Sequence, residues 1–311
     1  MTRPLLHLSA LLWLAAAGSP ANAEVERLVE GGAAFSPLAA TVVGETVVMA
    51  GVGGGVLRVD LSSGARAALP LPAPISWVAD AGDGTFLAIT TDGGFLYRVH
   101  LDGSVGEKTR TPRPLLAALP TPGGLVAAVA TAEPEKPLLW RGRLEALAPW
   151  RLKAKKHSLP PPLAAVADTV ALATDGSMTA VVWPFFRSEL ALVDGSGEAR
   201  LHPLPYFAEA WAPLSAAGAD PAAWPKPYAS VAVGGGRAWC LSFQEGPWAE
   251  DPAARRRGRH LVEVALDGRV VAQHRLSTDM YQVVYDHQRR RVLLLDRGGG
   301  VWTATFSPAE R

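Results

Sequence analysis

Two segments of the chain gather aromatic and arginine side chains. Residues 206–227 (YFAEAWAPLSAAGADPAAWPKP) and 244–260 (QEGPWAEDPAARRRGRH) interrupt a sequence that is otherwise rich in short apolar runs. Aromatic and arginine side chains contribute much of the binding energy of interfaces, and loops on a rigid scaffold often carry function. The chemistry they favour is recognition of a partner protein or of a small anionic or carbohydrate-like ligand. The candidate binding residues are Tyr206, Trp211, Trp224, Trp248, Arg255, Arg256, Arg257, Arg259 and His260, together with Phe186 from the stretch PFFRS.

The same residues also have a structural explanation. A long insertion needs a small core of its own, and its aromatic side chains would supply one by packing on the scaffold. The arginine run is equally compatible with a solvated cluster of charges. The sequence therefore predicts where a binding surface lies and leaves open how many of these residues touch a ligand.

Catalytic chemistry has a weaker basis. The seven histidines include no H-x-H or H-E-x-x-H pair, and no Ser, His and Asp group forms a recognised nucleophile motif. A metal site needs several convergent oxygens, and the carboxylates that could contribute are Asp80, Asp286 and Glu245. We therefore expect no cofactor, with Ca²⁺ or Zn²⁺ at these residues as the alternative. Cys240 lies in the apolar stretch RAWCLSF and is expected to be a buried, inert thiol.

A repeated unit indicates the scaffold that positions the two insertions. An apolar run reaches a glycine-rich turn, a second run follows, and another turn closes the unit; such internal periods mark repeat folds. Strand signals recur at intervals of about 8 to 12 residues, and helical periodicity is nearly absent, which predicts an all-β propeller. The clearest copies are GGGVLRVDLSSG (53–64), GGFLYRVHLDGS (93–104), SELALVDGSGEARL (188–201) and LVEVALDGRVV (261–271).

The chain divides into six such units, and seven blades remain the alternative. The last unit is one strand short, so we expect Glu26–Val29 to supply its outer strand and to close the ring. In this arrangement both insertions leave one face of the disc, the top face, beside the same blade. Tryptophans within strands, such as Trp77 and Trp183, are expected to pack between blades. The units are 35–75, 76–114, 115–162, 163–205, 228–280 and 281–311.

The unit GGFLYRVHLDGS resembles the repeats of the NHL, YVTN-type and lactonase-like propellers, in which a D-G or G-G turn precedes an xLYxxDLxG strand. This resemblance covers most of the chain and implies a six-bladed propeller. The segment Glu245-Gly246-Pro247-Trp248 is also similar to the E-G-P-x-W signature of gluconolactonase-like propellers, whose Glu binds a divalent metal. Here the segment is one residue shorter and far from the first blade, which weakens the implied metal role of Glu245.

The first 23 residues have the pattern of a secretory signal peptide. Arg3 precedes an apolar run, Leu5–Ala17, and the small-x-small triplet Ala21-Asn22-Ala23 follows. The apolar run is shorter than the roughly 20 residues that a membrane span needs. We therefore expect cleavage, a single propeller domain over 24–311, a periplasmic or secreted location and no membrane insertion of the mature chain. The short leader and the bias towards Ala, Arg, Gly and Pro suggest a bacterial source.

Composition narrows the choice of partner. The whole chain has 30 Lys and Arg against 29 Asp and Glu, and this balance argues against nucleic acid, which needs surplus positive charge. With a single cysteine the fold cannot have an internal disulfide, so a large core must stabilise it. We expect an exported, non-enzymatic propeller whose top face binds a protein of the envelope or exterior, or a small ligand. The alternative is a metal-dependent lactonase-like or esterase-like hydrolase.

Overall fold

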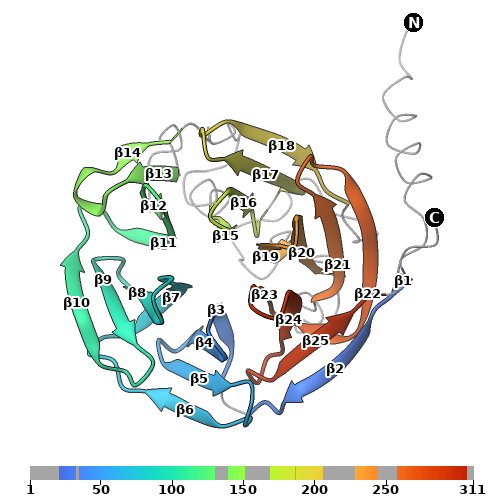
Figure 1. Cartoon of the computed structure of the whole chain (residues 1–311), viewed down its shortest axis with the longest axis horizontal. Coiled ribbons are helices and arrows are strands. Elements are labelled where there is room, and N and C mark those ends of the chain that lie inside the picture. The colour runs from blue at the N-terminus through green and yellow to red at the C-terminus, as the bar shows by residue number, and fades with distance from the viewer. Residues whose placement is uncertain are drawn as a thin grey trace, which may run out of the picture.

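The computed structural model describes residues 21–32, 35–129, 139–150, 169–185, 187–205, 228–243 and 258–306. Their strands form six sheets arranged radially about a central channel (Figure 1). Each sheet contains four antiparallel strands in a simple up-and-down order, and the fifth blade gains one more strand. The chain is therefore a six-bladed β-propeller, and the predicted fold and blade number are confirmed.

The first three blades follow one another along the chain, and the first strand of each is innermost. Blade one contains β3 (Pro37–Val43), β4 (Thr46–Gly51), β5 (Val56–Asp60) and β6 (Arg66–Leu69). Blade two contains β7 (Ile75–Asp80), β8 (Thr85–Thr90), β9 (Phe95–His100) and β10 (Val105–Arg110). Blade three contains β11 (Leu115–Thr121), β12 (Gly124–Val129), β13 (Leu139–Gly142) and β14 (Ala148–Pro149), with the 3-10 turn η1 (Leu144–Ala146) before the last strand.

The remaining blades use the same order, and the last two recruit strands from the start of the chain. Blade four contains β15 (Ala171–Thr174), β16 (Met178–Val182), β17 (Glu189–Asp194) and β18 (Ala199–Pro203). Blade five contains β19 (Tyr228–Gly234), β20 (Arg237–Phe243), β21 (Gly258–Ala265), β22 (Val270–Met280) and β1 (Ala21–Asn22). Blade six contains β23 (Gln282–Asp286), β24 (Arg291–Leu295), β25 (Val301–Thr305) and β2 (Glu24–Val29).

The repeated sequence unit corresponds to the third strand of a blade and the turn that follows it. In three blades an aspartate ends or follows this strand and its Oδ1 accepts hydrogen bonds from backbone N–H groups of the turn: Asp60 from Ser63 at 2.7 Å, Asp102 from Ser104 at 2.8 Å and Asp194 from Ser196 at 2.9 Å. This Asx-type bonding favours a tight reversal. The hydrogen bonds of the turn lower the pKa of Asp60, led by that of the Ser62 hydroxyl.

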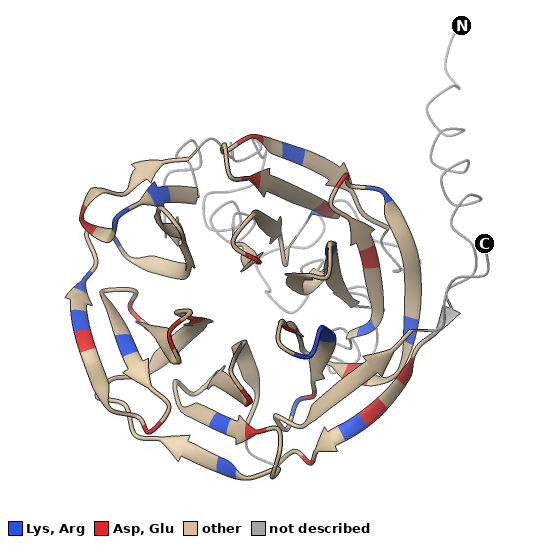
Figure 2. Ribbon diagram, viewed as in Figure 1, with Lys and Arg blue, Asp and Glu red and all other residues tan. Residues whose placement is uncertain are grey.

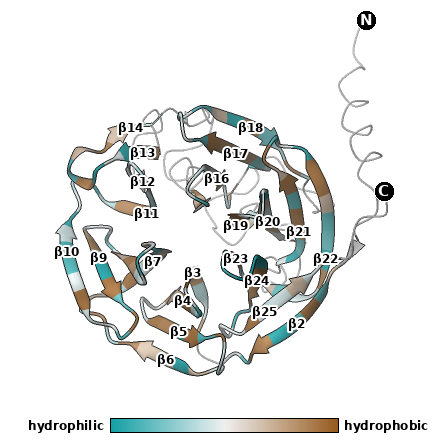
Figure 3. Cartoon of the chain, viewed as in Figure 1, coloured by the Kyte–Doolittle hydropathy of each residue, from teal (hydrophilic) through white to brown (hydrophobic). Residues whose placement is uncertain are grey.

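The core lies between the blades. Every residue of β4 and β8, the second strands of blades one and two, is buried, because both faces of these strands pack against other blades. The outermost strands are more hydrophilic (Figure 3), and most positions of β10 are exposed. The only helical element among the described residues is η1. None of the described residues forms a helix long and apolar enough to cross a membrane.

The N-terminal strand closes the ring as predicted. β2 lies beside β25 (Figure 1) and pairs antiparallel with it, with Val29 opposite Val301. It begins at Glu24, two residues earlier than the expected strand. β1 was not expected: it pairs in parallel with β22, where Ala21 lies opposite His274. It falls within the predicted signal peptide, so cleavage after Ala23 would remove β1 and keep β2.

Candidate functional site

Six inner strands surround a central cavity of about 1350 Å³. They are β3, β7, β11, β15, β19 and β23, and each contacts the next around the ring, with β23 returning to β3. All six begin on one face, which is the top face, and end on the opposite bottom face. On the top face the N–H of Ile75 donates to the Gly54 carbonyl at 2.8 Å and that of Leu115 to Gly93 at 3.0 Å. The top face therefore carries the blade-to-blade connections and the turns between second and third strands.

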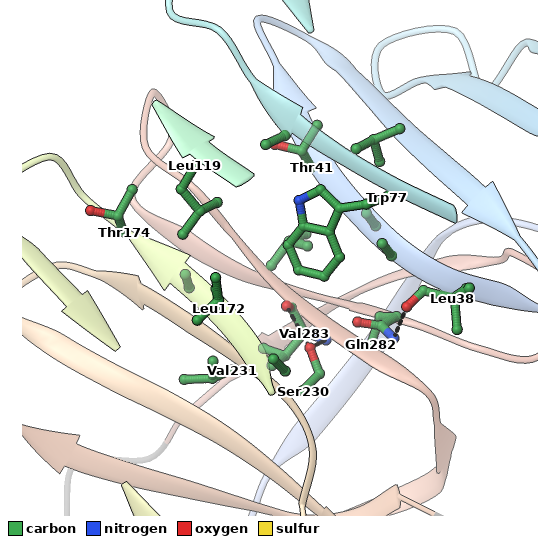
Figure 4. Close-up of a pocket in the computed structure, with 18 of the residues that line it drawn as sticks. Leu38, Thr41, Trp77, Leu119, Leu172, Thr174, Ser230, Val231, Gln282 and Val283 are labelled. Carbon is green, nitrogen blue, oxygen red and sulfur yellow. Dashed lines mark hydrogen bonds between the residues drawn. The ribbon is translucent and has the colours of Figure 1, made fainter. Parts of the chain in front are cut away.

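The wall of the cavity is mainly hydrocarbon. Trp77 on β7 projects into it, and Leu119 and Val283 lie around the same space (Figure 4). Trp77 is half-buried and also packs against three clusters of core residues. Further apolar lining comes from the other inner strands, among them Leu38, Val42, Leu172 and Val231.

Three polar side chains of the wall join neighbouring inner strands. The Thr41 hydroxyl of β3 accepts the N–H of Asp80 at 2.9 Å. Gln282 Nε2 of β23 donates to the Leu38 carbonyl at 2.8 Å (Figure 4). The Ser230 hydroxyl of β19 accepts the N–H of Val283 at 3.3 Å. Each of these bonds crosses from one blade to the next. Because these polar groups are engaged with the backbone, the wall offers a ligand mostly apolar surface.

The top mouth of the cavity is bordered by exposed apolar side chains. Leu38, Val52 and Leu116 line the cavity and are 47%, 69% and 41% exposed. They are three of the five exposed large hydrophobic residues among those described. Phe185 and Tyr281 line the same end. We call these five residues the top collar. Large contiguous patches of exposed apolar surface are rare on soluble proteins, and they often mark binding sites.

The bottom mouth is polar. Asp80, Asp175 and His287 line the cavity there, each in or beside the turn that follows an inner strand. The turns between the first and second strands carry charged positions around the channel (Figure 2). Partial loss of water around the Asp80 carboxylate raises its pKa, against the opposing hydrogen bond from the Gly82 N–H and the nearby His287. A tight turn, as the sequence indicated, explains the position of Asp80.

Most of the predicted top-face residues lie outside the described residues. These are Tyr206, Trp211, Trp224, Trp248, Arg255, Arg256, Arg257 and Phe186. The strands that flank 206–227 and 244–257 do end at the top face, beside blade five, as expected from the topology. Arg259 and His260 belong to β21 instead of the insertion, which corrects the predicted boundary at 260. Arg259 pairs with Asp279 of β22, and His260 is buried, so both residues serve the blade.

Of the carboxylates of the metal alternative, the structure describes Asp80 and Asp286. Asp286 is fully buried and pairs with Arg291 at 3.2 Å and Arg289 at 3.7 Å, within its own hairpin. Asp80 lies at the bottom mouth, and Glu245 is outside the described residues. In the part of the chain that the structure describes, no three His, Cys, Asp or Glu side chains are placed to share a metal ion.

Sequence reasoning missed the channel as a site because its residues are individually unremarkable. Trp77 packs against core clusters as expected, but it is only half-buried and also lines the cavity, whereas Trp183 is fully buried. One signal was present: Leu38 and Leu116 are apolar residues at the starts of inner strands, next to the turns of the top face. Cys240 is buried, as expected, and its complete burial raises the pKa of its thiol.

Comparison with known proteins supports the fold. No protein-family model matches the sequence, and no curated protein is significantly similar to it. Virginiamycin B lyase from Staphylococcus aureus has a TM-score of 0.56 at 11% identity, covering 92% of this chain and 100% of the lyase. A DUF4221 protein from Bacteroides vulgatus scores 0.62 at 11% identity, with coverages of 94% and 98%. A gluconolactonase from Xanthomonas campestris scores 0.55 at 14% identity, with coverages of 92% and 90%.

These similarities define the class of protein and go no further. At 11% to 14% identity they show a shared six-bladed propeller fold. These structural neighbours include a lyase and a gluconolactonase, and those activities belong to the neighbours themselves. The resemblance to lactonase-like propellers is therefore confirmed at the level of the fold.

Proposed function

We propose that the chain is an exported, non-enzymatic binding propeller whose central channel takes up an apolar small molecule through the top face. The observation that carries this proposal is the 1350 Å³ cavity, whose wall is mainly apolar and in which the polar side chains of Thr41, Ser230 and Gln282 are bonded to neighbouring inner strands. Ligand pockets are typically concave, mostly apolar and roughly 300–1,000 Å³ in volume, so the channel is large enough. Transfer of apolar ligand surface from water to this wall would drive binding.

The top collar supports entry from that side. Leu38, Val52 and Leu116 expose apolar surface at the mouth and continue into the apolar wall. The bottom mouth has carboxylates instead, and an apolar molecule there would displace their water without forming a compensating hydrogen bond. The strands that flank the predicted insertions end at the top face beside blade five, which supports the proposal that the aromatic and arginine residues of the insertions belong to the same binding surface.

The test places a charge in the path of the ligand. Leu116→Asp introduces a carboxylate at the top mouth, at a residue exposed enough for the fold to tolerate the change. Leu201→Asp is the matched control, because Leu201 on the outer strand β18 is 50% exposed and distant from the channel. We expect a neutral apolar dye to bind the full chain, to bind Leu116→Asp at least about tenfold more weakly, and to bind Leu201→Asp normally.

The competing outcomes are separable. Equal dye binding by the two variants, or no dye binding by the unaltered chain, would reject the channel as the site. Lactone or ester turnover by the purified chain with added Ca²⁺ or Zn²⁺ would favour the hydrolase instead.

A further inference from the structure

The two mouths of the channel differ in charge. Among the described residues that line the cavity, the only cation at the top is Arg297, in the turn between β24 and β25. At the bottom are Asp80, Asp175 and His287. The wall between the mouths carries no charged side chain in the described part of the chain. A molecule held along the channel therefore has one end near a guanidinium group and the other near two carboxylates.

The turn that carries Arg297 is fixed by its neighbour. Asp296 Oδ1 accepts the N–H groups of Gly298 and Gly300, both at 2.8 Å, and Oδ2 accepts the indole N–H of Trp302 at 2.9 Å. This carboxylate is thus engaged in holding the turn. Arg297 itself is exposed, and no hydrogen bond or ion pair joins its side chain to another described residue. Its guanidinium group is placed at the mouth and remains available to a ligand.

Unlike Arg297, the two carboxylates at the bottom mouth are engaged in hydrogen bonds that hold their own turns. Asp175 Oδ1 accepts the backbone N–H groups of Ser177 and Met178, each at 2.9 Å, and Asp80 Oδ1 accepts that of Gly82 at 2.9 Å. His287 packs edge-on against Tyr285, with ring centroids 5.0 Å apart. Two carboxylates at this end repel an anionic group, whereas Arg297 attracts one at the other end.

We infer that the ligand of the channel is an amphipathic carboxylate, with its hydrocarbon part along the apolar wall and its carboxylate at Arg297 in the top mouth. This inference rests on the proposed function, because it assumes that the channel holds an apolar ligand. The fork of a guanidinium group matches a carboxylate in a bidentate pair. β3 has seven residues and spans roughly 23 Å, which leaves room for an extended hydrocarbon tail.

The experiment compares three probes with alkyl tails of nine or ten carbons. The head group is anionic in decanoate, neutral in decanol and cationic in decyltrimethylammonium. Their affinities for the full chain are measured by displacement of a neutral apolar dye. We expect decanoate to bind about tenfold more tightly than decanol, the gain of a charge-assisted hydrogen bond, and more tightly than the cation.

Two variants assign the preference to the residue. Arg297→Gln should lower the affinity for decanoate to that for decanol and leave decanol binding unchanged. Arg110→Gln, at an exposed arginine of the outer strand β10, should keep the full preference. Decanol binding as tightly as decanoate, a preference for the cation, or a preference that survives Arg297→Gln would overturn the inference while the proposed function stands. Failure of all three probes to bind would reject both.

Discussion

His260 is a buried histidine at the start of the strand that follows the second insertion. It is 5% exposed on β21, and its register partner on β22 is Arg275. Loss of hydration, and then the charge of Arg275, lower the pKa of His260 to about 4. The imidazole is therefore neutral in the folded protein at neutral pH.

Acidification should destabilise the fold through this residue. In the unfolded chain a histidine has a pKa near 6.5, so between about pH 6.5 and about pH 4 the unfolded state binds a proton that the folded state does not. The free energy of unfolding then falls as the pH falls, by up to about 1.4 kcal/mol per pH unit. We expect His260→Gln to remove this part of the slope in urea titrations, and His100→Gln, at an exposed histidine, to retain it. Equal slopes in the two variants would contradict the assignment.

The turn between β8 and β9 is an element whose shape is set by contact between blades. Gly93 has a φ of 69°, and its carbonyl accepts the N–H of Leu115 at 3.0 Å and the hydroxyl of Thr111 at 2.7 Å. A Cβ at Gly93 would lie 2.6 Å from both N and O of Leu115. Gly44, in the turn between β3 and β4, has a φ of 59° and open space around the same position.

Comparison of these two glycines separates backbone strain from the close approach of blades. Gly44→Ala should cost about 1 kcal/mol, since a left-handed backbone is its only difficulty. Gly93→Ala should cost about 3 kcal/mol or more, because the new methyl group also forces the start of β11 away from the turn. Urea unfolding of both variants measures the difference. Similar losses would mean that the blade contact at Gly93 yields easily.

Elements with a local signal could be predicted, and those that depend on distant partners could not. Aspartate and glycine turns such as that at Asp60 repeat in the sequence, so the six blades followed from it. β1 has only two residues and pairs with a strand some 250 positions away, so no local sequence pattern predicts it. The end of the second insertion was misplaced because Arg259 and His260 read as surface residues, although β21 buries the histidine.

The apolar character of the channel could not be predicted for a related reason. The Thr41 hydroxyl accepts the Asp80 N–H, and the Gln282 amide donates to the Leu38 carbonyl. Both bonds cross between blades, and the local sequence does not indicate such contacts. The same threonine and glutamine, read singly, suggest a polar wall. Only their bonding to neighbouring strands leaves an apolar channel.

At the scale of the whole molecule, the ring is closed by strands from opposite ends of the chain. β23 contacts β3, which completes the inner ring, and β2 completes the sheet of blade six on its outer side (Figure 1). Val29 of β2 is 6% exposed and packs in one cluster with Val301, Leu295 and Met49, so it joins blade six to blade one. Without β2, the edge of β25 would be open to other chains.

Removal of β2 should therefore cost both stability and solubility, and the two effects have one cause. A chain that begins at Glu24 keeps β2, whereas a chain that begins at Gly31 loses its hydrogen bonds to β25 and the burial of Val29. We expect the shorter chain to unfold at a temperature at least roughly 5 °C lower, which corresponds to a loss of a few kcal/mol in a protein of this size, and to associate in size-exclusion chromatography. A synthetic peptide of residues 21–32 should restore the unfolding temperature and the monomer, because it re-forms the same edge. A shorter chain that stays monomeric and melts like the longer one would show that the five complete blades and the three remaining strands of blade six close the ring unaided.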